Sequence, residues 1–85
     1  MRTSEEIQSL IFDKYGMKCT VVIEYDIIQQ AKVFHISPES YPGICLSGIY
    51  EARFNHMTDD EFCAVALDNG IQWAKITFES KELSL

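Results

Sequence analysis

Basic residues are scarce in this chain of 85 residues, where seven lysines and arginines stand against thirteen acidic residues and give a net charge of −6. The basic residues are scattered, with no two adjacent: Arg2, Lys14, Lys18, Lys32, Arg53, Lys75 and Lys81. Proteins that bind nucleic acid or an anionic membrane gain affinity from clustered Lys and Arg. The sequence therefore argues against direct contact with nucleic acid or membrane. Its charge favours a basic protein partner, although such a charge also simply keeps a small protein in solution.

Paired cysteines and an apolar leader are also missing. The three cysteines, Cys19, Cys45 and Cys63, cannot all pair within one chain, and their spacing contains no C-x-x-C motif. Free thiols of this kind are typical of a reducing compartment. The first six residues are mostly polar, and no apolar run approaches the length of a membrane span. We expect a cytoplasmic protein.

Sequence motifs for catalysis, metal binding or cofactor binding do not occur either. The chain has no glycine-rich phosphate loop, no G-x-S-x-G and no H-E-x-x-H. The acidic run Asp59-Asp60-Glu61 lacks the alternating spacing of a calcium loop, and its place at the start of a helix explains it by charge–dipole attraction. His35 is expected to point outward from a strand, and His56 to bond loop backbone. We expect no catalytic residue, no metal and no cofactor.

Two helices are indicated by capping signals. The first, at about 4–15, starts with the capping box Thr3/Glu6 and ends at Gly16. The second, at about 59–69, starts with the box Thr58/Glu61 and is expected to end at Asn69-Gly70. Both carry apolar residues at helical spacing, so each has a face to bury.

Four strands are predicted from alternating apolar and polar residues. They lie at about 18–26, 32–37, 44–55 and 71–79, with an ambiguous segment at 27–31, a proline-containing loop at 37–43 and a polar tail from Ser80. The chain has room for one domain, residues 1–85. The predicted fold class is α+β, with a four-stranded, mostly antiparallel sheet, two helices on one face, and the order α-β-β-β-α-β.

The sheet face without helices is the predicted protein-binding surface. Its apolar members are expected to be interleaved with charges, and an exposed Trp is typical of interface hot spots. The candidate residues are Trp73, Ile49, Val22, Glu24, Asp26, Glu51 and His35. A register slip of one residue in the last strand would place Trp73 in the core instead. A second candidate surface is the acidic face of the first helix, with Glu5, Glu6, Ser9 and Asp13.

These observations favour a small acidic binding protein that is not an enzyme. The leading hypothesis is an inhibitor that covers a basic surface of a nuclease or a nucleic-acid-handling complex, of the toxin-immunity or phage anti-defence type. The alternative is a structural or assembly subunit that homodimerises through its exposed sheet face. An enzyme or ligand carrier would need a deep pocket, for which so short a chain has little room.

Overall fold

The computed structural model describes residues 2–83 of the chain, and side chains as far as Lys81. Helix α1, Ser4–Tyr15, confirms the predicted first helix. The Thr3 side chain accepts a hydrogen bond from the backbone N–H of Glu6 at 3.1 Å. Gly16 ends the helix in the left-handed region at φ 66°, where glycine costs least. The helix buries Ile7, Leu10 and Ile11.

Three antiparallel strands form the sheet, in the order β1-β2-β3. They are β1 at Cys19–Asp26, β2 at Ala31–Pro38 and β3 at Leu46–Ile49. Residues 27–30 of the ambiguous segment 27–31 form the turn of the β1–β2 hairpin, and Ala31 begins β2. Because Val21 pairs with Ile36 and Phe34 pairs with Gly48, these residues share one face of the sheet. Strand β3 is an edge strand.

The third strand is shorter than predicted. It was predicted over 44–55, but β3 ends at Ile49, so the prediction is wrong for the residues that follow. The chain instead forms a short 3-10 helix, η1, at Ala52–His56. This turn buries Phe54, which packs edge-to-face on Tyr50 at 5.7 Å and on Phe62 at 5.4 Å between ring centroids. Phe54 is therefore a core residue that reaches the core from a turn.

The predicted fourth strand at 71–79 is wrong, because this segment is helical. Helix α2 (Asp59–Phe62), the short π-helix η2 (Cys63–Leu67) and helix α3 (Asp68–Leu83) follow one another without a break. Leu67, Ile71 and Ala74 are buried, and their spacing of four and three residues gives a helical stripe. The observed fold is therefore α+β with a three-stranded antiparallel sheet and two helical segments, in the order α-β-β-β-α.

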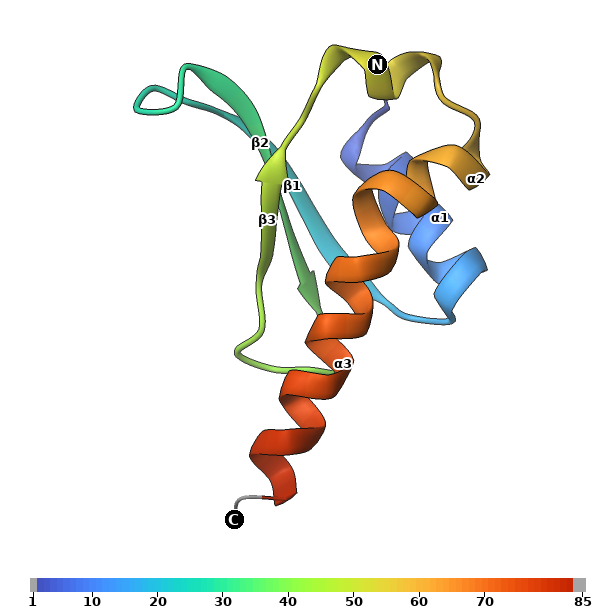
Figure 1. The fold of residues 1–85 in the computed structure, drawn as a ribbon, viewed down its shortest axis with the longest axis vertical. Helices are drawn as coiled ribbons and strands as arrows, with labels where there is room; N and C mark the ends of the chain where they lie inside the picture. Colours follow the sequence, from blue (N-terminus) through green and yellow to red (C-terminus); the bar gives the residue numbers. More distant parts are fainter. Residues whose placement is uncertain (1, 84–85) are drawn as a thin grey trace.

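Both helical segments pack on the same face of the sheet, as Figure 1 shows. α1 lies against β1, and α3 contacts β3. The molecule measures 41 × 31 × 19 Å, and the shortest dimension corresponds to about two layers spaced by ~10 Å. Among residues 2–83, no helix is long and apolar enough to cross a membrane. The opposite face of the sheet is not covered by either helical segment.

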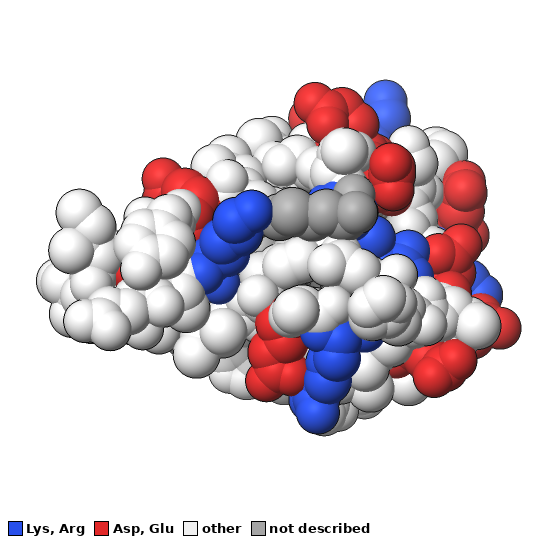
Figure 2. All heavy atoms as spheres, turned by 90° about the horizontal axis from the view of Figure 1, so that it is seen from above, with Lys and Arg blue, Asp and Glu red and all other residues white. Residues whose placement is uncertain are grey.

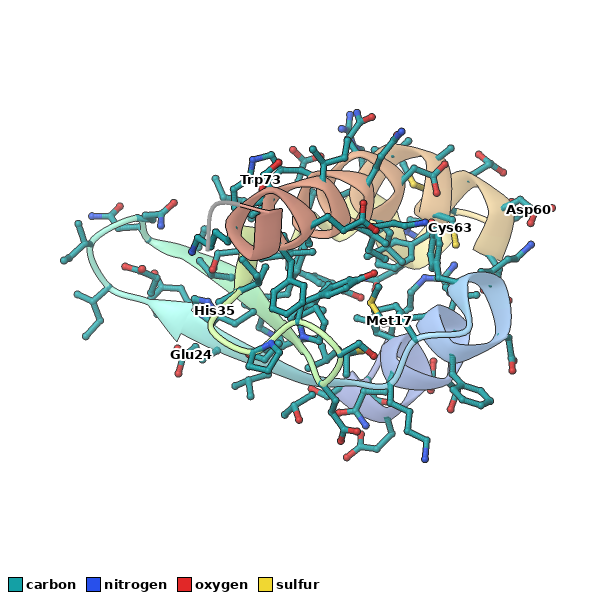
Figure 3. The ribbon with its side chains drawn as sticks, turned by 90° about the horizontal axis from the view of Figure 1, so that it is seen from below. Met17, Glu24, His35, Asp60, Cys63 and Trp73 are labelled. Carbon is teal, nitrogen blue, oxygen red and sulfur yellow. The ribbon has the colours of Figure 1, made fainter. Side chains whose placement is uncertain are left out.

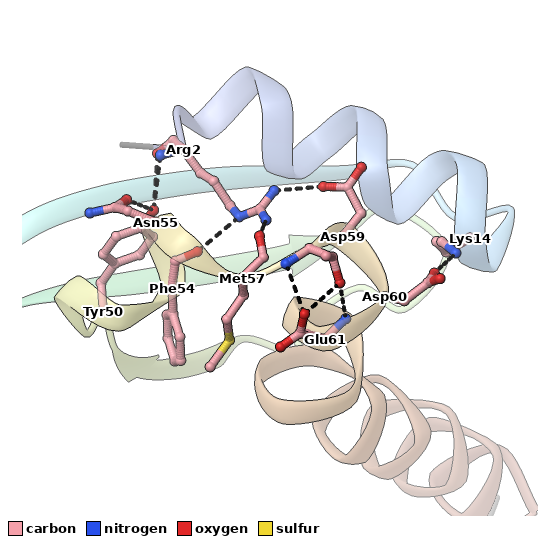
Figure 4. Close-up of polar contacts among 10 residues, drawn as sticks. Arg2, Lys14, Tyr50, Phe54, Asn55, Met57, Asp59, Asp60 and Glu61 are labelled. Carbon is pink, nitrogen blue, oxygen red and sulfur yellow. Dashed lines mark hydrogen bonds and ion pairs between the residues drawn. The ribbon is translucent and has the colours of Figure 1, made fainter.

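Arg2 joins the start of the chain to the segment between the sheet and α2 (Figure 4). Its guanidinium donates to the backbone carbonyls of Phe54 at 3.3 Å and Met57 at 2.5 Å, and pairs with Asp59 at 2.7 Å. It also lies 4.8 Å from the ring centroid of Phe62. Sequence reasoning counted Arg2 only as one scattered charge, because no local motif indicates contacts across more than fifty residues.

Candidate protein-binding groove

An open groove of about 480 Å³ lies between β3 and the second helical segment. Its volume falls in the range of about 300–1,000 Å³ that is usual for binding pockets. None of its lining residues is charged. They are Phe34, Ile36, Cys45, Leu46, Ser47, Gly48, Ile49, Phe54, Val65, Ala66, Leu67, Gly70 and Trp73. We call this surface the β3–α3 groove.

Trp73 lies on α3 rather than on a sheet face, which corrects its predicted position. Ala66, Gly70 and Trp73 are spaced by four and three residues, so they share the side of the helix that lines the groove. The Trp73 side chain is 54% exposed and is therefore not a core residue. Figure 3 shows it on α3, apart from Glu24 and His35 on the strands. Trp73 and Ile49, two of the predicted binding residues, thus both border the groove, Ile49 from the edge strand β3 with its side chain on the opposite face of the sheet.

Helix α3 faces β3 at Gly70, where the space beside the glycine has room for a methyl group. A Cβ atom built on Gly70 would lie 3.5 Å from Cδ1 of Leu46, in ordinary van der Waals contact. The space beside Gly48 is too small for a side chain, because a Cβ atom there would lie 2.8 Å from Cζ of Phe34. The ring of Phe34 therefore occupies the space beside Gly48 and forms part of the groove floor.

The free edge of β3 borders the groove. The backbone N–H of Tyr50 donates to the carbonyl of Lys32 at 2.8 Å, in line with the β2–β3 ladder. Because inward and outward pairs alternate in an antiparallel ladder, the N–H and C=O groups of Ser47 and Ile49 point away from β2. Among residues 2–83, no backbone hydrogen bond beyond the helices and strands reaches Ser47 or Ile49.

The uncovered sheet face holds three other predicted residues together with Ile49. Val22 pairs with His35, and Val33, which pairs with both Glu24 and Ile49, is 3% exposed. His35 lies 3.3 Å from a Glu24 carboxylate oxygen through Nε2 and 2.7 Å from Ser47 Oγ through Nδ1. Val22 and the Glu24–His35 pair therefore lie on the same face as Ile49, which turns away from the helices, and Val33 lies between Glu24 and Ile49.

The remaining two predicted residues have local partners. The Asp26 carboxylate accepts a hydrogen bond from the backbone N–H of Gln29 at 3.0 Å and so stabilises the hairpin turn. Glu51 pairs with Arg53 at 2.5 Å, just after β3. The seven candidates are thus divided between the groove, the uncovered sheet face and two local contacts, and do not form one continuous patch.

Exposed apolar side chains at the hairpin tip and on α3 were missed. Ile27 is 82% and Ile28 94% exposed at the tip of the β1–β2 hairpin. Val65 and Ile76, on the second helical segment, are also more than half exposed. The Ile27-Ile28 pair between two predicted strands was a possible signal for the exposed tip. The exposure of Ile76 was missed because residues 71–79 were predicted to form a strand. Figure 2 shows the tip as an uncharged projection.

The acidic face of α1 borders a shallow depression of about 380 Å³, lined by Arg2, Glu5, Glu6, Ser9, Leu10, Asp13 and Asp59. Many acidic side chains gather at this end of the molecule, away from the hairpin tip (Figure 2). In the acidic run at the start of α2, Asp59 pairs with Arg2 and Asp60 with Lys14. Glu61 completes the capping box with Thr58. Each member of that run therefore has a structural role.

The cysteines differ in accessibility. Cys19 and Cys63 are buried, and burial raises the pKa of both thiols, which lowers their nucleophilic thiolate fraction. Cys45 is exposed at the groove, 4.0 Å from the Ser47 hydroxyl. Within residues 2–83, no cluster of three or more His, Cys, Asp or Glu side chains could hold a metal ion.

Comparisons with protein-family models, with curated proteins and with solved structures give no significant match for this chain.

Proposed function

We propose that this chain is a non-catalytic protein-binding domain, and that its binding surface is the β3–α3 groove. The observation that carries the proposal is the half-exposed Trp73 beside the open edge of β3. A large aromatic side chain in a concave apolar site is typical of an interface hot spot. Catalysis, by contrast, calls for titratable groups that converge in a pocket, and the groove is lined by uncharged residues.

The proposed partner is a protein with a basic surface, in particular a nuclease or a nucleic-acid-handling complex that this chain inhibits. The net charge of −6 and the acidic side chains on α1 and α2 support this class of partner. Charges outside a contact accelerate the encounter, whereas apolar anchors inside it slow dissociation. Trp73 and Ile49 would act as anchors, and exposed acids such as Glu24 and Glu51 as steering charges.

Affinity purification with a paired variant tests this function. The tagged chain and its Trp73→Ala variant would be used to capture proteins from the native host or from an organism that competes with it. A specific partner, identified by mass, should be retained by the parent and depleted with the variant. Its nucleic-acid-processing activity should fall when the parent chain is added. A retained partner without nucleic-acid activity would contradict the inhibitor function but not protein binding.

Salt dependence separates steering from anchoring. Reversal of Glu24 and Glu51 to Lys should mainly slow association and flatten its dependence on ionic strength. Trp73→Ala should mainly accelerate dissociation. An association rate that is insensitive to salt would contradict a basic partner surface.

A further inference from the structure

We propose that the β3–α3 groove binds an extended segment of a partner protein, which adds to the sheet as a strand along β3. The segment carries no acidic residue and places a large apolar side chain between β3 and α3. This inference rests on the proposed protein-binding function and specifies how the partner is held. It adds main-chain hydrogen bonds between β3 and the partner segment, which the proposed function does not require.

The backbone of β3 is prepared for strand addition. Ser47 and Ile49 direct their N–H and C=O groups to the open edge, as the hydrogen bond from Tyr50 to Lys32 indicates. An edge strand with unpaired backbone groups is a template for another chain. Several peptide-binding domains use this mode, in which main-chain hydrogen bonds give affinity and pockets for alternate side chains give specificity.

The groove supplies such a pocket on the helix side of the added strand. Successive side chains of a strand point to opposite faces, so every second residue of the segment would face α3. Gly48, in the middle of β3, places no side chain in the pocket. The ring of Phe34 forms the floor of the pocket. Trp73 and Val65, both more than half exposed, form the helical wall. A volume of about 480 Å³ accommodates a large aliphatic or aromatic side chain.

Charge restricts the segment. The groove lining carries no charge, so a charged side chain inside it would lose hydration without gaining a partner. Glu51 lies two residues after the end of β3, and Glu24 lies on the uncovered sheet face. Together with the net charge of −6, these carboxylates repel an acidic segment and favour a neutral or basic one.

A second copy of the chain fits this groove less well. If two β3 strands paired antiparallel about a two-fold axis, with Ser47 opposite Ile49, the central residue facing each groove would be Gly48. Glycine offers no side chain to fill the pocket. Two copies would also each bring a net charge of −6. The groove therefore favours a different chain.

The test uses a phage-displayed library of random linear peptides, selected on the folded domain. The selected peptides should lack Asp and Glu and should alternate apolar residues. Ser47→Pro removes the outward N–H of the edge and leaves the ladder to β2 intact, because proline is tolerated on that side of an edge strand. Ser47→Ala is the matched control, since it keeps this N–H and removes the same side chain. Ser47→Pro should weaken peptide binding about tenfold relative to Ser47→Ala.

Amide hydrogen exchange gives a second readout. In the free protein, the amides of Ser47 and Ile49 should exchange fast, and those of Gly48 and Tyr50 slowly. Saturating peptide should slow exchange at Ser47 and Ile49. If the proline and alanine variants bind equally, or if these two amides stay unprotected, strand addition is overturned.

Two further outcomes also overturn the inference. One is the absence of any selected peptide on a folded domain. The other is a concentration-dependent dimer that Ser47→Pro abolishes, which would identify a second copy as the occupant. The proposed function fails separately, if capture of the partner does not depend on Trp73.

Discussion

Replacing Arg2 by alanine should destabilise the fold strongly, although the residue lies next to the start of the chain. The variant loses charge-assisted hydrogen bonds to the carbonyls of Phe54 and Met57, which are partly buried. Each such bond contributes about 1.5–3 kcal/mol. The pair with Asp59 contributes less than about 1 kcal/mol, because 64% of the Asp59 side chain is exposed. Contact with the Phe62 ring adds about 0.5–1 kcal/mol.

Water can reach part of this site, so we expect a loss of about 3 kcal/mol from the free energy of unfolding. That is a large share of the roughly 4–13 kcal/mol typical of a domain of this length. Urea denaturation followed by Trp73 fluorescence measures the loss. With a slope of about 1–3 kcal/mol per M, the midpoint should fall by about 1–3 M.

Two controls isolate the geometry of the guanidinium group. Arg2→Lys keeps the charge but loses the fork that reaches two carbonyls, so its loss should be intermediate. Asp59→Asn should cost less than about 1 kcal/mol. A denaturation midpoint of Arg2→Ala equal to that of the parent would refute the contacts of Arg2 with Phe54, Met57 and Asp59 and, with them, the position of the η1–α2 segment.

Four other predictions concern the helices and the thiols. Gly70→Ala should raise the free energy of unfolding by about 0.5–1 kcal/mol, because Gly70 lies inside a helix and its side has room for a methyl group; a destabilised variant would indicate that the helix ends there. Gly16→Ala should lower stability by about 1 kcal/mol, because Gly16 has φ 66°, and equal stability would contradict the left-handed cap. Thr58→Ala should cost about 1 kcal/mol through loss of the capping bond, measured by the same denaturation. Cys45 should react with a thiol reagent well before Cys19 and Cys63, because it alone is exposed; mass spectrometry after timed quenching measures this. Cys45→Ser should remove the fast phase of labelling. Rapid labelling of either buried thiol would contradict the fold.

The elements with strong local signals were predicted correctly from the sequence. Helix α1 has a capping box and a terminal glycine, and its predicted bounds are those observed. The alternating residues of β1 and β2 likewise define their faces, with Val21 and Ile36 toward the core. In these segments the local conformational preference of the residues agrees with the tertiary packing, so their secondary structure can be predicted from a single sequence.

The second half of the chain could not be predicted in the same way. Asn69-Gly70 is typical of a helix end, and 71–79 also alternates well enough for a strand. Tertiary packing decides that this segment is a helix. Gly70 faces Leu46 on β3, and the buried helical stripe of Leu67, Ile71 and Ala74 fills the core. Similarly, alternation continues past Ile49, but burial of Phe54 is achieved in a turn.

The candidate site was only partly accessible from the sequence. An exposed Trp73 and Ile49 were predicted as anchors, and both line the groove. Their environment was not predictable, because it depends on α3 lying beside β3 instead of a fourth strand pairing with it. Val65, on the second helical segment, lies half-exposed at the groove, and no local pattern in the sequence indicates this. The cytoplasmic location stays a prediction.

The most direct test of the groove as a binding surface is the affinity of the purified partner for two matched variants, measured by calorimetry. Trp73 and Phe12 are aromatic residues of similar exposure, at 54% and 51%, but Phe12 lies on α1, outside the groove. Trp73→Ala should weaken binding by at least about 2 kcal/mol, and Phe12→Ala by less than about 0.5 kcal/mol. Both variants should stay folded, since neither side chain is buried. Equal affinities of Trp73→Ala and the parent chain, or a larger loss with Phe12→Ala, would contradict the account.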